Sequence, residues 1–274
     1  PNAAESAEAF RMLIAIAMNS GQLDRAVELL DKIPAESTHR ASIELNTGQA
    51  LWVNYLKLKR AATDSGTLLA QTPKLNEIRS KAELLLANGI TSVTAKNINR
   101  SKAKSVLSLA KIYAEKKAGT KTLQLMEHPE FGLLSLAKNK KPSAQDPRFR
   151  LDVFRTALKG YVHSIAPGSD AGAIATTMEK ASAMMSDLEA VTSEMENGDK
   201  IIVSLYYAFA NDIKSKMDSL KSVDAKKKFS SGLSDFLEGA GNNSTDFQVI
   251  MWAASTLIKV ADSFAVEGEK SEAT

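Results

Sequence analysis

The sequence predicts an all-α fold, and three observations support this prediction. Only 7 of the 274 residues are Pro and only 14 are Gly, so signals for strands and tight turns are scarce. Ala, Leu, Lys, Glu, Ser and Met are plentiful, and most of these residue types favour helices. Apolar residues recur at helical spacing along almost the whole chain, from which we expect about eleven helices and no sheet.

The first two predicted helices form a hairpin. The apolar face of the first consists of Phe10, Leu13, Ile14 and Ala17, at the offsets of one helix face. A second apolar series fills residues 23–33 and stops at Pro34. Residues 19–21, with the sequence Asn-Ser-Gly, predict the turn between the two helices.

Two longer helices are expected next. The first covers about residues 43–62 and is followed by a predicted loop at 63–72. The second covers about 73–88, with a proline in its first turn, and Gly89 is expected to end it. Residues 90–95 form a β-branched cluster that is too short to build a sheet, so we expect a linker or helix cap there.

The best internal boundary is the Lys-rich segment that holds Pro142. It follows predicted helices at 101–117, 120–127 and 131–138. We therefore expect N-terminal hairpins at 1–138, a linker at 139–145, C-terminal hairpins at 146–266 and a frayed tail at 267–274.

Capping residues place the helices of the C-terminal part. Asp146 followed by Pro147 predicts an N-cap with proline at the first helical position. Asp170 predicts the start of a Met- and Ala-rich helix that runs to about residue 197. The remaining predicted helices cover residues 199–220, 222–237 and 247–264.

Composition excludes several function classes. The chain has no cysteine, which removes disulfides, thiolate nucleophiles and cysteine metal sites. A formal net charge of +3, with nearly as many acidic as basic residues, gives no specific nucleic-acid signal. The best apolar run, 249–261, is interrupted by Lys259, so we expect no membrane-spanning segment. The compartment, cytoplasmic or periplasmic, and the oligomeric state stay open.

No motif predicts catalysis, a cofactor or a metal. His39, His128 and His163 lack metal-ligand spacing, and no phosphate-binding loop is present. Three Ser-x-x-Lys matches occur, but a chain this rich in Ser and Lys contains such matches by chance, so they do not predict a serine nucleophile. We expect a protein that is not an enzyme; a helical enzyme domain with no recognisable motif is the alternative.

The turn of the first hairpin is flanked by residues at set spacings. Gly21 lies five residues before Ala26, and Ile14 and Ala17 lie seven and four residues before Gly21. This pattern resembles the turn and second helix of a tetratricopeptide repeat, with Ile14 and Ala17 at the packing positions of the first helix. A shift of 34 residues, the family's period, takes Ile14 to Gly48, and a glycine there permits close helix approach. The resemblance covers residues 5–60. It implies a superhelical stack of antiparallel helix hairpins, an α-solenoid, and we expect the chain to be part of a larger bacterial protein.

The resemblance also implies a function. Such repeats are non-catalytic scaffolds that bind a peptide or partner protein along a groove lined by the first helices. The positions that match groove-facing ones are Arg11, Ala15, Met18, Asn19, Leu45, Gln49, Trp52 and Val53. An RNA-binding helical repeat is a further alternative, because it would also use hairpins of similar length.

Overall fold

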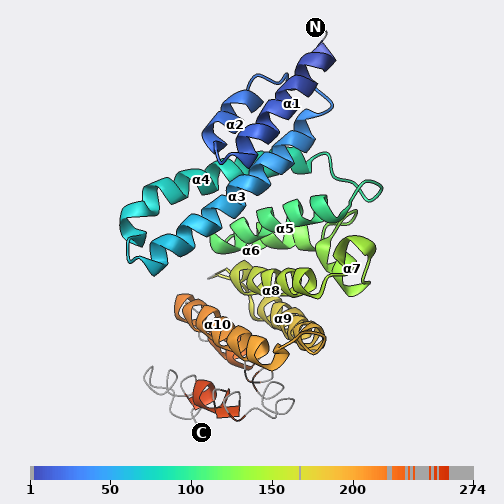
Figure 1. Ribbon diagram of the computed structural model, residues 1–274. Helices are drawn as coiled ribbons and strands as arrows, with labels where there is room; N and C mark the ends of the chain where they lie inside the picture. The colour runs from blue at the N-terminus through green and yellow to red at the C-terminus, as the bar shows by residue number, and fades with distance from the viewer. Residues whose placement is uncertain are drawn as a thin grey trace. The chain divides into compact units, whose positions relative to one another are not determined.

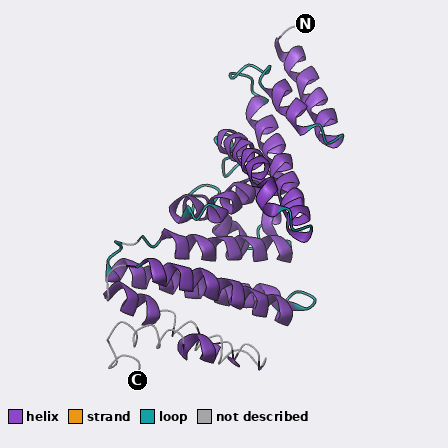
Figure 2. Ribbon diagram, turned by 90° about the vertical axis from the view of Figure 1, so that its left-hand side faces the viewer, coloured by secondary structure: helices purple, strands orange, loops and turns teal. Residues whose placement is uncertain are grey.

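The computed structural model describes residues 3–166, 168–220, 224–231, 234, 237, 247, 250–251 and 253–258. These residues form helices and connecting turns, and no strand occurs among them (Figure 2). The prediction of an all-α chain is therefore confirmed over the described part. The predicted tail at 267–274 lies outside the described residues, and the predicted helix at 247–264 is described only in part.

The chain divides into two compact units. The first comprises residues 1–113 and 127–144, and the second comprises 114–126 and 145–274. The first contains α1 (Ala3–Asn19), α2 (Leu23–Leu30), α3 (Arg40–Asp64), α4 (Leu68–Ile90), most of α5 (Arg100–Glu115), α7 (Leu133–Lys138) and the 3-10 helix η1 (Pro142–Ala144). The second contains α6 (Gly119–Met126), α8 (Pro147–Ser164), α9 (Ala171–Thr192) and α10 (Gly198–Ser219) (Figure 1).

Helices α1 and α2 are joined by a tight turn. Gly21 occupies the left-handed region with φ of 75°, where glycine is least strained. The Gln22 amide donates to the Ala17 carbonyl at 2.8 Å and closes the end of α1. The two helices then pack on each other and bury Ile14, Ala26 and Leu30. The predicted first hairpin is thus two packed helices, as the spacing of its apolar residues indicated.

Helices α3 and α4 pack closely because two glycines face the opposite helix. A Cβ atom on Gly48 would lie 2.8 Å from Leu86 Cγ, and one on Gly89 would lie 2.6 Å from the Ala41 carbonyl oxygen. Position 48 therefore meets position 86 while position 89 meets position 41, so the helices run antiparallel. The expected close approach at Gly48 is confirmed. The expectation that Gly89 ends the helix is wrong, because Gly89 lies inside α4 and packs on α3.

Helix α4 begins earlier than the sequence predicts. It starts at Leu68, so Pro73 lies inside it rather than in its first turn, and the connection from α3 is only residues 65–67. The turn is closed by the Thr67 amide, which donates to the Ala62 carbonyl at 2.9 Å, and by Gly66 with φ of 70°. Proline costs the helix one backbone hydrogen bond there, and the packing of α4 on α3 outweighs that loss.

The second unit contains a similar close approach between α6 and α8. A Cβ atom on Gly119 would lie 2.1 Å from the Ser164 amide nitrogen, and one on Gly160 would lie 3.0 Å from Leu123 Cδ2. Positions 119 and 123 thus meet positions 164 and 160, and this pair is antiparallel as well. The start of α6 is fixed directly against the end of α8.

The caps predicted at Asp146 and Asp170 in the second unit are confirmed. The Arg148 amide donates to Asp146 Oδ1 at 2.9 Å, with Pro147 at the first helical position of α8. The Ala173 amide donates to Asp170 Oδ1 at 2.8 Å at the start of α9. Helix α9 ends at Thr192, five residues before the predicted end, and α10 begins after Asn197.

Candidate protein-interaction surface

The inner face of α1 is fixed against α2, and its outer face carries large apolar side chains. Ile14 and Ala17 are buried, whereas Met12, Leu13 and Ile16 are exposed by 55%, 44% and 64%. We call these three residues the α1 stripe. At roughly 100° per residue, the stripe and the exposed Ala9 fall within an arc of about 100°. Ile14 lies nearly opposite the centre of this arc, and Ala17 lies beside it, next to Leu13. Helix α1 therefore has a second apolar face that no described side chain buries.

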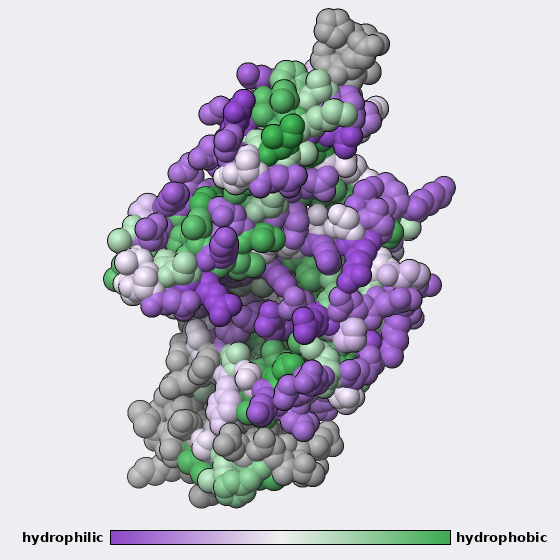
Figure 3. Space-filling view, viewed as in Figure 1, coloured by the Kyte–Doolittle hydropathy of each residue, from purple (hydrophilic) through white to green (hydrophobic). Residues whose placement is uncertain are grey.

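Apolar side chains are also visible on the surface of the first unit. The space-filling view shows them gathered over α1 and α2 (Figure 3). Exposed apolar side chains rimmed by polar residues are typical of interaction sites. The α1 stripe is therefore the best candidate for a functional surface in the first unit.

The polar residues predicted on α1 flank this stripe. Arg11, Ala15 and Asn19 are exposed, and Met18 is half-buried. On the helical projection, the three exposed residues occupy the arc that adjoins Met12. The Arg11 side chain donates to Glu8 Oε2 at 2.8 Å, and this hydrogen bond lowers the pKa of the Glu8 carboxyl below its ordinary value. The exposed residues predicted on α1 thus border the α1 stripe on one side.

Two of the residues predicted on α3 are core residues instead. Leu45 and Trp52 are each 3% exposed. Leu45 packs beside Gly89 of α4, and the Trp52 ring stacks on Tyr55 with 4.9 Å between ring centroids. No partner can reach them in this conformation, so we remove both from the candidate surface. The packing of α4 on α3 covers the face that the tetratricopeptide resemblance had left open.

The other two residues predicted on α3 remain partly accessible. Val53 is 55% exposed, and Gln49 is half-buried. Gln49 Oε1 is buried, and no hydrogen-bond partner for it occurs among the described residues. Val53 can therefore contact a partner directly, whereas the Gln49 amide is directed into the protein.

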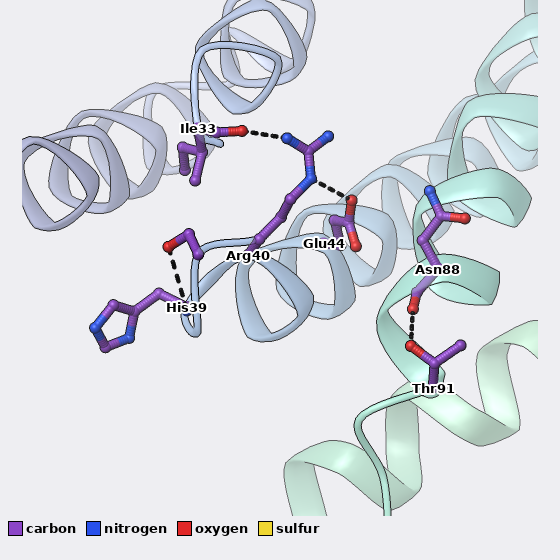
Figure 4. A network of polar contacts seen from close by, with 7 residues as sticks. Ile33, His39, Arg40, Glu44, Asn88 and Thr91 are labelled. Atoms are coloured by element: carbon purple, nitrogen blue, oxygen red, sulfur yellow. Dashed lines mark hydrogen bonds and ion pairs between the residues drawn. The ribbon is translucent and has the colours of Figure 1, made fainter. Parts of the chain in front are cut away.

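A polar network holds the start of α3 to the end of α2 (Figure 4). The Arg40 guanidinium donates to the Ile33 carbonyl and, through Nε, to Glu44 Oε1 at 3.0 Å. Glu44 is only 5% exposed, so this pair lies largely out of water and its charge-assisted hydrogen bonds are stronger than those of a surface pair. The network fixes α3 relative to the α1–α2 pair and so fixes the setting of the α1 stripe.

Sequence reasoning missed the α1 stripe. It placed Leu13 on the core face with Phe10, whereas Leu13 is 44% exposed, and it assigned no role to Met12 or Ile16. The missing signal was available: residues 9, 12, 13 and 16 have the i, i+3, i+4, i+7 spacing of a second apolar face. A helix that is apolar on two faces is a sign of burial or of binding.

The three histidines are spread over both units. His39 precedes α3, His128 stacks on Phe131 with 3.7 Å between ring centroids, and His163 lies near the end of α8. No group of three or more His, Cys, Asp or Glu side chains able to hold a metal ion occurs among the described residues. Over the same part of the chain, we found no helix with the length and apolarity needed to cross a membrane.

Comparisons of the chain with protein-family models, with curated proteins and with solved structures gave no match.

Proposed function

We propose that the protein is a non-catalytic interaction scaffold that binds the apolar face of an amphipathic helix from a partner protein. The single observation that carries this proposal is the α1 stripe, which exposes three large apolar side chains on two turns of one helix. A straight apolar stripe on a helix is complementary to another helix, because side-chain ridges on one fit the grooves of the other.

The free energy gained by burying the α1 stripe alone is too small for stable binding, so the partner must also contact neighbouring residues. Burying the exposed part of Met12, Leu13 and Ile16 contributes roughly 1 kcal/mol for each side chain. That sum is smaller than the entropic cost of association, so stable binding needs further contacts. Arg11, Ala15 and Asn19 adjoin the stripe on the same helix and are exposed. We propose that they contact the polar flank of the bound helix.

We also propose that the helix pairs belong to a tetratricopeptide-like superhelical stack. Three features support this: the left-handed glycine at position 21, the close approach at Gly48, and the consecutive packed pairs α1–α2 and α3–α4. In such a stack the first helix of each pair lines the binding groove, so under this proposal α1 lines it with its exposed residues, and α3 contributes Val53 but not the buried Leu45 and Trp52.

Selection of helical peptides tests the proposed function. A displayed library of peptides about 15 residues long, long enough to form a helix, is panned against the purified chain. We expect the selected sequences to carry apolar residues at i, i+3 and i+4. The variant Met12→Ser with Ile16→Ser should bind them at least about tenfold more weakly.

A matched control uses another exposed apolar residue. Leu69 of α4 is 90% exposed and lies outside the stripe, so Leu69→Ser should leave binding unchanged. Selection of extended rather than helical peptides would contradict the proposal. So would a change in the sedimentation of the free double variant, because the stripe would then be a self-association face.

A further inference from the structure

Four basic side chains of the second unit come together near the end of α8. Lys159 and His163 lie one turn apart on one face of α8, and Asp212 and Lys216 are related in the same way on α10. Lys159 Nζ lies 4.0 Å from Asp212 Oδ2, so these two faces meet. Lys117 precedes α6. We call Lys117, Lys159, His163 and Lys216 the basic cluster.

The packing of α6 on α8 places Lys117 in this cluster. A Cβ atom on Gly119, two residues after Lys117, would lie 2.3 Å from the His163 carbonyl carbon. In this turn Lys117 occupies the left-handed region with φ of 57°, and its amide donates to the Ala114 carbonyl at 3.1 Å. Lys117 is exposed, whereas His163 and Lys216 are half-buried. The cluster is therefore open to solvent on one side.

The positive charge of the cluster is only partly neutralised. Burial is the main cause that lowers the pKa of His163; Asp212 opposes this effect, and Lys117, Lys216 and Lys159 add to it. Burial and then the charge of Lys117 lower the pKa of Lys216. One aspartate thus faces three lysines, and that aspartate is paired with Lys159. Lys117 and Lys216 form no ion pair with any described residue.

Converging ammonium groups that lack a counter-charge favour an anion with several charges and several acceptor oxygens. A phosphate group carries about −1.5 to −2 charges at neutral pH and accepts from several donors at once. A carboxylate supplies a single charge and two oxygens. Lysine is a common phosphate ligand because its flexible stem brings a compact charge to the anion.

We propose that the basic cluster is a phosphate-binding site, in which Lys117 and Lys216 contact the anion and Asp212 keeps Lys159 in place beside it. His163 takes up a proton from solvent when the dianion binds, because the anion offsets the repulsion between the lysines and the imidazolium. This site belongs to the second unit and does not depend on the α1 stripe.

The test follows the His163 imidazole by NMR while the purified chain is titrated with inorganic phosphate at constant ionic strength. We expect a saturable shift of the His163 signals and a higher pKa of His163 in the presence of phosphate. The variant Lys117→Gln with Lys216→Gln should weaken binding at least about tenfold. The conservative variant Lys216→Arg should retain it.

A lysine elsewhere on α10 is the matched control. Lys200 is exposed and lies 16 residues before Lys216, about 24 Å along the helix, so Lys200→Gln should bind as the wild type does. A second titration with glycerol 3-phosphate distinguishes the sources of the group: binding of both ligands assigns the site to phosphate esters as well, and binding of inorganic phosphate alone assigns it to the free ion. A shift that does not saturate, that chloride reproduces, or that persists in the double variant would overturn the proposal.

Discussion

At the scale of the residue, the Thr47 hydroxyl is an unusual buried group. Thr47 lies in α3 at 0% exposure, and no hydrogen-bond partner for Oγ1 occurs among the described residues. A buried hydroxyl without a partner loses its hydration and gains nothing in return. Thr47 therefore lowers the stability of the pair α3–α4.

We predict that Thr47→Val stabilises the protein. The substitution keeps the side-chain shape and removes the unpaired hydroxyl, so the free energy of unfolding should rise by about 1 kcal/mol. Urea denaturation measures this change. Thr156→Val is the control, because the Thr156 hydroxyl is also buried but donates to the Asp152 carbonyl at 2.6 Å. That control should not gain stability, and an equal gain in both variants would contradict our account of Thr47.

His163 predicts how stability depends on pH. Its pKa is lowered in the folded chain, chiefly by burial, from the ordinary value of 6.5. Between the folded pKa and 6.5 the unfolded chain therefore binds more protons. The neutral, buried His163 therefore contributes its full stabilisation of the folded state above about pH 6.5, and this contribution is lost as the pH falls through the folded pKa of His163.

The measurement is the free energy of unfolding against pH in buffers free of phosphate. His163→Gln should reduce the loss of stability below about pH 6.5. An unchanged slope in His163→Gln would show that other groups set the pH dependence.

At the level of the helices, glycines allow the backbones of two paired helices to approach closely. Gly48 and Gly89 bring α3 and α4 together, and Gly119 and Gly160 do the same for α6 and α8. The resulting contacts fix two antiparallel pairs, one in each unit.

We predict that Gly119→Ala disrupts the pairing of α6 with α8. The new Cβ atom would lie 2.1 Å from the Ser164 amide nitrogen and 2.6 Å from the Gly160 carbonyl oxygen, and backbone atoms cannot yield as a flexible side chain can. We expect a loss of about 2–3 kcal/mol, seen as faster amide hydrogen exchange in α6 and α8. Gly168→Ala, where no atom lies within 4 Å, should be close to neutral. Similar exchange in both variants would be inconsistent with this packing.

The positions of the helices were largely predictable from the sequence. Which side of each helix is buried was harder to predict. Caps such as Asp146 and Asp170 act locally, so their positions were correct. The start of α4 was misplaced because a local rule for Pro73 was overridden by packing on α3. Leu45 and Trp52 were assigned to a surface because a single sequence does not reveal which helix covers them.

At the scale of the whole molecule, the two proposed sites differ in how far sequence could reveal them. The α1 stripe lies within two turns of one helix, so its spacing is visible in the sequence. The basic cluster combines residues from position 117 to position 216, which only the packing of α6, α8 and α10 brings together. The Lys run at 226–228 is more conspicuous in the sequence, but none of its lysines is among the charges that shift the pKa of His163.

Methyl NMR can show whether the α1 stripe binds a partner helix as proposed. A peptide selected from the helical library is titrated into the chain while the methyl signals of Met12, Ile16 and the buried Ile174 of α9 are followed. We expect the Met12 and Ile16 signals to shift together and saturate with one dissociation constant, while Ile174 stays unchanged. Peptide binding that leaves the Met12 and Ile16 methyl groups unperturbed would show that the α1 stripe is not the binding site.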